Sequence, residues 1–263
     1  MASKSAHPVE TLRAHATALE AAMTVVLADP RKPAVHKVRA MVRRLEAQVE
    51  LLSQLAALPA GSTETEELHR RLRKLGRAAG RVRDVDVQRE ILKTHPSLPR
   101  RAAEELRDEL KDARETRAKK LQRVLTKQLP RIAGAIEGLV VSVGTANGLV
   151  LPDLRLIPLI ERWTLAHQQE SPELLDDDQL HTARKTAKTA RYMVENAKGS
   201  PAAQRVAARY DEQQDVGGQW HDWVDLADTA REYFGKKHPL TVAAERQCKS
   251  ARAKYVALLH KDA

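Results

Sequence analysis

A chain of 263 residues, 42% hydrophobic and 30% charged, can bury one large core or two smaller ones and is not expected to be disordered. Its net charge of +10 favours partners that are rich in phosphate. The single cysteine, Cys248, excludes an intramolecular disulfide and fits a reducing compartment, so we expect a cytoplasmic protein.

In the first half of the chain, the spacing of apolar residues predicts helices, and prolines indicate where helices begin or end. Apolar residues three or four positions apart predict helices over residues 8–28, 33–57, 64–94 and 100–129. Pro130 is expected to kink or end the last of these. The apolar stretch 132–151 carries Glu137, Asn147 and four glycines, so we interpret it as a helix end and a linker, not as a membrane span.

The same pattern resumes after the glycine-rich stretch 138–152, which is the best candidate for a boundary. It predicts helices over residues 153–169, 174–198, 201–234 and 239–261. We therefore predict an all-α fold of two four-helix bundles, with residues 1–145 in the first bundle and residues 146–263 in the second.

A His-x-x-Arg-x-x-x-Arg/Lys motif occurs on the second predicted helix of each half. Offsets of 0, +3 and +7 lie within about 60° of one another on a helix, so each copy forms one cationic stripe. Arginine can hold phosphate oxygens with two donors, and lysine adds a mobile charge. With the cations that widen them, the stripes comprise His36, Arg39, Arg43 and Arg44 in the first half, and His181, Arg184, Lys185, Lys188 and Arg191 in the second.

The third predicted helix carries a further stripe of cations, and no acidic residue interrupts residues 69–83. Ion pairs within the stripe are therefore unavailable, and an anion or a neighbouring helix must offset the repulsion. The fourth helix differs, because acidic residues from Glu104 to Glu115 alternate with basic ones, which is typical of a solvated face. The stripe consists of Arg70, Lys74, Arg77 and Arg81.

A second motif also recurs, and with the first it indicates an approximate two-fold internal repeat. GRVRDVDV, from Gly80, aligns with GQWHDWVD, from Gly218, which places Asp84 opposite Asp222. Asp84 and Asp86 are two residues apart, so their side chains diverge by about 200° on a helix. We interpret these acids as partners that orient arginines, and we predict no metal site, no cofactor and no catalytic residue.

Aromatic content bears on the kind of polyanion. Every Phe, Trp and Tyr lies at or after Trp163, so the first cationic stripe has no aromatic platform. Single-stranded nucleic acids are held by stacking bases on such platforms, whereas a duplex can be held through its phosphates alone. A chain of bare phosphates needs only closely packed cations.

These motifs, VHKVRAMVRRLEA, GRVRDVDV, LHTARKTAKTARYMVE and GGQWHD in that order, resemble those of the CHAD family, named for its conserved histidine α-helical domain. The resemblance spans roughly residues 8–261. It implies two four-helix bundles around a basic groove that binds inorganic polyphosphate without hydrolysing it, and association with polyphosphate granules. The E-x-E-x-K motif of a triphosphate tunnel module, which some relatives carry, is absent here.

The resemblance implies that both stripes bind polyphosphate. It adds supporting positions on the third helix. In the second half, Gln219 and His221 stand where Arg81 and Arg83 would align, so the groove is expected to be asymmetric. The alternatives are a phosphate-backbone nucleic-acid binder and, third, an enzyme of phosphate metabolism. We expect the two stripes to face each other, with support from Arg73, Lys74, Arg77 and Arg83.

Overall fold

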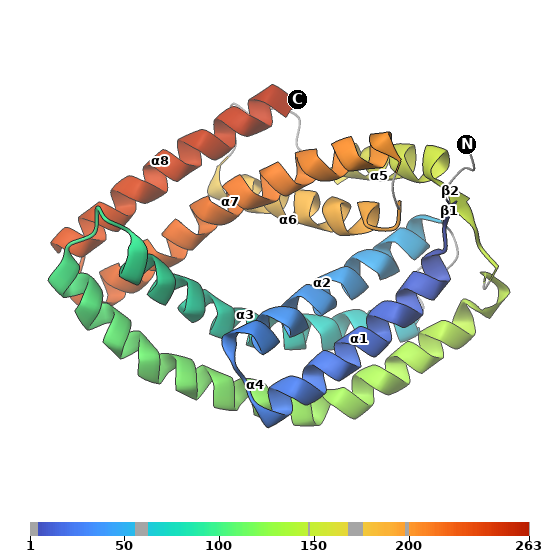
Figure 1. Ribbon diagram of the computed structural model, residues 1–263, viewed down its shortest axis with the longest axis horizontal. Helices are drawn as coiled ribbons and strands as arrows, with labels where there is room; N and C mark the ends of the chain where they lie inside the picture. Colours follow the sequence, from blue (N-terminus) through green and yellow to red (C-terminus); the bar gives the residue numbers. More distant parts are fainter. Residues whose placement is uncertain (1–4, 56–62, 147, 168–175, 198–199, 263) are drawn as a thin grey trace.

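Eight α-helices make up most of the residues that the computed structural model describes, namely 5–55, 63–146, 148–167, 176–197 and 200–262 (Figure 1). The all-α prediction is confirmed; the two-fold symmetry stays a prediction. The helices are α1 (Pro8–Ala28), α2 (Lys32–Gln54), α3 (Thr63–Thr94), α4 (Arg100–Ser142), α5 (Asp153–His167), α6 (Asp177–Val194), α7 (Pro201–Phe234) and α8 (Pro239–Asp262).

Helix starts follow local chemistry. A proline stands in the first turn of α1, α2 and α7, where its missing N–H costs nothing. A capping box starts α6, with Asp176 accepting from the Gln179 N–H and Gln179 accepting from the Asp176 N–H. Residues 56, 57, 147, 168, 169, 174, 175 and 198, over which we predicted helix ends or linker, lie outside the described part of the chain.

The fourth helix does not end at Pro130, because α4 continues to Ser142. A proline inside a helix costs about 3 kcal/mol. The turns beyond it bury Ile132 and Leu139 in the core with α1, α2 and α3. Each buried aliphatic side chain contributes about 1.5–3 kcal/mol, so together they offset the proline.

Two short strands and a 3-10 turn were not predicted. β1 (Ser5–Ala6) pairs antiparallel with β2 (Leu151–Pro152), and a 3-10 turn covers Gly144–Ala146. Ala6 and Leu151 are both buried, so this pairing fastens the segment before α1 to the linker before α5.

Three apolar clusters hold the helices together. The first joins α1, α2, α3 and the C-terminal part of α4. The second joins the C-terminal part of α3 and the N-terminal part of α4 to α6, α7 and α8. The third joins α2 to α5, α6 and α7. Two clusters therefore take residues from both sides of residue 145, and the boundary there stays a prediction.

Adjacent glycines of α7 give opposite predictions. A Cβ on Gly217 would lie 2.8 Å from Cζ of the buried Tyr255, whereas one on Gly218 meets nothing within 4 Å. We expect Gly217→Ala to lower the free energy of unfolding by about 1–3 kcal/mol through overpacking. Gly218→Ala should raise it by about 0.5–1 kcal/mol through helix propensity. Thermal unfolding of both variants checks this, and a loss in both would contradict it.

Candidate functional site

Cations from both halves of the chain line one cavity. Its volume is about 320 Å³, and four helices contribute to it. Arg39 of α2 and Arg83 of α3 come from the first half, and Arg184 and Lys188 of α6 come from the second. The two histidine–arginine stripes thus face each other through these side chains. We call this hollow the cationic cavity; its other lining residues, all on α7, are Gln214, Asp215, Gly218, Gln219 and Asp222.

Three of the four cations lack a counter-ion within the described residues. Arg39, Arg184 and Lys188 form neither an ion pair nor a side-chain hydrogen bond there, and Arg184 is only 8% exposed, with its Nε unpaired. Burial lowers the pKa of Arg184, and the charge of Arg39 lowers it further. Burial also lowers the pKa of Arg39. Buried charges are normally paired, so this cluster is suited to receive an anion.

Lys188 is the most strongly affected member of the cluster. Burial, followed by the charges of Arg184, Arg39, Arg43 and Arg83, lowers its pKa to about 6. Lys188 is thus largely uncharged at pH 7 until an anion enters the cavity. Lysine is the cation whose pKa moves most readily on burial.

Gly80 makes room for Arg39 beside α3. A Cβ at this position would lie 3.1 Å from Nη1 of Arg39, closer than ordinary contact. The glycine that opens the repeated motif therefore lets the guanidinium of α2 lie against the α3 backbone. That placement directs Arg39 towards the same cavity as Arg83.

Arg83 is the paired member of the four. Its Nη1 donates to Oδ1 of Asp222 at 2.6 Å, which joins α3 to α7, and its Nη1 lies 3.7 Å from Oδ1 of Asp84. Asp86 pairs instead with Arg114 of α4, at 2.8 Å. The interpretation of these acids as partners of arginines is confirmed.

Neither motif histidine lines the cationic cavity. Nε2 of His36 lies 4.0 Å from Oδ2 of Asp86, and the His181 ring centroid lies 4.6 Å from that of Trp220 and 4.9 Å from that of His221. Burial lowers the pKa of both His36 and His181. Both are therefore largely neutral at pH 7, and neither adds a charge to the cavity.

Arg44 and Arg191 belong to an ion-pair network and not to the cationic cavity. Arg44 Nε donates to Glu195 at 2.6 Å, and Arg191 Nη1 donates to the same carboxylate at 3.3 Å. Arg191 also pairs with Asp211 of α7. These two cations join α2, α6 and α7, and their charge is already matched.

The remaining predicted positions lie outside the cavity lining. Arg43 pairs with Glu46 at 2.9 Å, although its charge still lowers the pKa of Lys188. Lys185 is exposed on α6. On α3, Arg83 lies about 200° round the helix from Arg81, so the α3 stripe faces away from the cavity. Its exposed members include the supporting positions Lys74 and Arg77, and Arg73 is also exposed.

The sequence reading missed two residues of the cavity wall. Gln214 and Asp215 stand one helical turn before Gly218 and Gln219, so they share a face with the repeated motif. Counting back four residues, or about one helical turn, from Gly218 and Gln219 would have identified them. Oε1 of Gln214 is buried without a hydrogen-bond partner in the described structure; as an acceptor it can pair with a donor but not with a phosphate oxygen.

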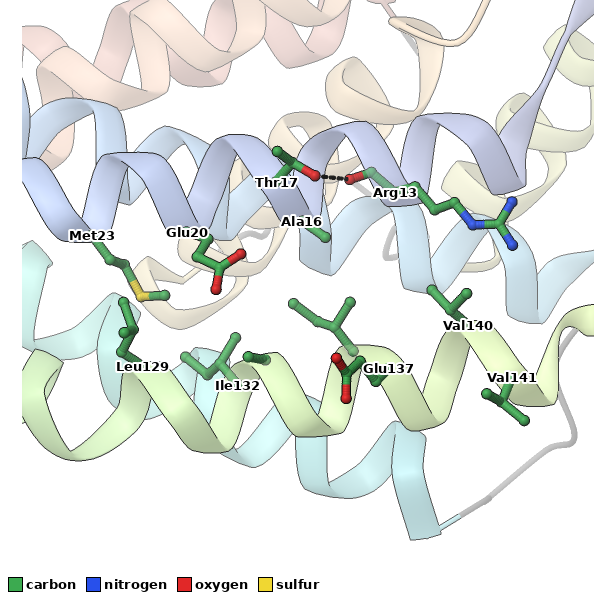
Figure 2. Close-up of a pocket in the computed structure, with 12 residues that line it drawn as sticks. Arg13, Ala16, Thr17, Glu20, Met23, Leu129, Ile132, Glu137, Val140 and Val141 are labelled. Atoms are coloured by element: carbon green, nitrogen blue, oxygen red, sulfur yellow. Dashed lines mark hydrogen bonds between the residues drawn. The ribbon is translucent and has the colours of Figure 1, made fainter.

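A second hollow has a different character. The groove between α1 and α4, about 590 Å³, is lined by Met23, Ile132 and Val140 among others (Figure 2). Its charged lining residues are one arginine, Arg13, and two carboxylates, Glu20 and Glu137, so it lacks the excess of basic side chains found in the cationic cavity. Among the described helices, none combines the length and apolar character that a membrane crossing requires. Nowhere in the described chain do three His, Cys, Asp or Glu side chains gather to form a candidate metal site.

Comparison with known proteins identifies the family. The family model of the CHAD domain matches residues 10–231. No curated protein matches the sequence.

Two solved structures share the fold. The crystal structure of the CHAD domain from the plant Ricinus communis superposes with a TM-score of 0.70 at 18% identity, covering 99% of this chain and 93% of that one. PptA from Streptomyces chartreusis superposes with a TM-score of 0.59 at 17% identity, covering 97% of this chain and 98% of that one.

Proposed function

Since the chain belongs to the CHAD domain family, we propose that it binds inorganic polyphosphate in the cationic cavity. The observation that carries this proposal is the meeting of three basic side chains from both halves of the chain, Arg39, Arg184 and Lys188, none of which forms an ion pair in the described structure. A buried, unpaired cation costs stability, so the cluster is explained best by an anion that completes it.

The shape of the cavity favours polyphosphate over nucleic acid. At about 320 Å³, the cavity is at the low end of small-ligand pockets, and a duplex is far too wide to enter it. A single strand could enter, but no aromatic residue is among the described residues that line the cavity. A thin phosphate chain needs only the donors that Arg39, Arg184 and Lys188 supply.

We propose further that binding is non-catalytic and that the protein resides on polyphosphate granules in the cytoplasm. The arginine and lysine side chains hold phosphate oxygens, and Asp222 is engaged with Arg83. A general base for attacking water would need a free carboxylate or imidazole aimed at the chain. Asp222 and Asp86 instead join α3, α4 and α7 through Arg83 and Arg114. Asp215 is the other carboxylate of the cavity wall, and the phosphate-release measurement below tests whether it acts as a base.

The test of this proposal compares three ligands. Calorimetric titration at fixed salt should show tight binding of long-chain polyphosphate, weaker binding of triphosphate and weaker binding still of orthophosphate. Duplex DNA should fail to displace polyphosphate at matched phosphate concentration. Equal affinity for all chain lengths, or displacement by DNA, would refute the proposal. Release of phosphate during the titration, with or without Mg²⁺, would refute its non-catalytic part.

A further inference from the structure

The outer surface of the α3–α4 hairpin carries a second concentration of positive charge. No acidic residue occurs over residues 68–83 of α3 or over residues 116–136 of α4. The two helices pack side by side, because Arg117 donates to the carbonyl of Arg81 at 3.1 Å and Arg71 donates to Gln128 at 3.3 Å. Their middle portions therefore present cations next to one another. We call the set the exterior basic face; it consists of Lys74, Arg77, Arg81, Lys120, Lys127 and Arg131.

The cations of this face are free to meet a ligand. All six are exposed, and none forms an ion pair with another residue in the described structure. Glu67, the carboxylate that precedes this stretch of α3, is taken by Arg70 and Arg71. The face thus differs from the first half of α4, where acidic residues such as Glu104 pair with neighbouring arginines.

This face is separate from the cationic cavity. Arg81 points about 200° away from Arg83 around α3, so no short ligand can touch both. The two hydrogen bonds between α3 and α4 place position 81 beside position 117 and position 71 beside position 128. From position 74 to position 81, α3 therefore runs beside the part of α4 that carries Lys120 and Lys127.

Its shape selects among polyanions. α4 bows along the outer edge of the molecule with its convex side outward (Figure 1). Duplex DNA is stiff over about 50 nm, so it does not bend to follow a bowed helix. The first half of the chain also lacks aromatic side chains on which single-stranded bases could stack. A flexible chain of bare phosphates can follow the curve.

Resting on the proposed function, we propose that the exterior basic face binds a second segment of a long polyphosphate chain whose first segment occupies the cationic cavity. The protein then holds long chains at two places and short chains at one. Joining two binding events on one flexible chain raises overall affinity by about 10²–10⁴-fold without any new contact at either site.

The experiment separates the two sites by ligand length. Charge reversal at two lysines, Lys74→Glu with Lys120→Glu, should weaken binding of long-chain polyphosphate by about tenfold or more. The same variant should bind triphosphate with unchanged affinity, and its affinity should depend less steeply on salt. A matched control, Lys236→Glu with Lys237→Glu, alters exposed lysines at the turn before α8, away from this face.

Three outcomes would overturn the inference. Unchanged affinity of the exterior variant for long chains would show that the face is only a solvated surface. Equal weakening by the Lys236 and Lys237 control would show that net charge alone is responsible. Loss of duplex DNA binding with retention of long-chain binding would assign the face to nucleic acid. A different result would refute the proposed function: normal binding of long chains and of triphosphate by a variant of the cavity itself, Arg39→Glu with Arg184→Glu. Because triphosphate binds only in the cavity, its affinity tells that failure apart from the three outcomes above.

Discussion

Arg39→Glu combined with Arg184→Glu should abolish triphosphate binding and strongly weaken long-chain polyphosphate binding, while leaving the helical content intact. Each charge-assisted hydrogen bond contributes about 1.5–3 kcal/mol, so losing both arginines costs at least about 3 kcal/mol, or more than a hundredfold in affinity. The two new carboxylates also repel phosphate. Titration with triphosphate and with long chains measures the loss, because triphosphate reports on the cavity alone.

Folding should survive this double change for a specific reason. Neither arginine is held by an ion pair in the described structure, although the charge of Asp84 acts on Arg39 and that of Asp222 acts on Arg184. Basic groups also act on this cluster, including Arg43, Arg83 and Lys188. A glutamate at either place gains attractive neighbours. Circular dichroism and thermal unfolding are the controls. Unfolding of the variant would mean that the arginines are structural, and full-strength binding by a folded variant would exclude the cavity as the site.

Sequence periodicity predicted the helices well because it records burial. Leu68, Leu72, Leu75 and Val82 recur at helical spacing on α3, and all are fully buried. The sequence left open whether Pro130 kinks or ends α4, because a local rule cannot weigh the distant core that the following turns bury, and the helix continues to Ser142. The pairing of β1 with β2 was invisible for a related reason. Two residues on each side carry no periodicity, and their pairing depends on the tertiary approach of segments far apart in sequence.

The sequence predicted that the chain has a cationic site, but not which of the predicted cations belong to it. Spacing correctly placed Arg39, Arg184 and Lys188 on helix faces that meet. It could not show that Arg44 and Arg191 would share Glu195, since one of these contacts joins residues 151 positions apart. Nor could continuity of charge along α3 show that its stripe turns outward, because the packing of α3 against α2 and α4 determines that rotation. A cation that forms an ion pair with a carboxylate of the protein has a structural role, whereas a cation without such a partner is available to bind an anion. The sequence shows that the cation is present but not whether it is paired.

The pH dependence of binding follows from the same unpaired cluster. Lys188 has a pKa of about 6 in the free protein, lowered by burial and by the nearby arginines. A bound phosphate chain adds negative charge beside the ammonium group and therefore raises this pKa. Asp225 has a pKa raised to about 6 by burial and by Asp84 and Asp222, and a bound anion would raise it further. Both groups thus take up protons on binding.

Polyphosphate affinity should accordingly be highest near pH 6 and fall as the pH rises towards 8. Below pH 6, Lys188 is charged in the free and bound states, so the affinity does not depend on it. Above pH 6, the free protein must gain a proton to bind, and the affinity falls by up to about tenfold per pH unit for each such group. Lys188→Arg keeps its charge at every pH, so it should remove the part of the pH dependence of affinity that comes from Lys188. Asp225→Asn should remove the part that comes from Asp225. Long chains are the appropriate ligand, because the titrating terminal phosphates are a small share of their charge. A wild-type affinity that is flat from pH 6 to pH 8, or a slope unchanged in Lys188→Arg, would mean that the buried ammonium does not meet the phosphate chain.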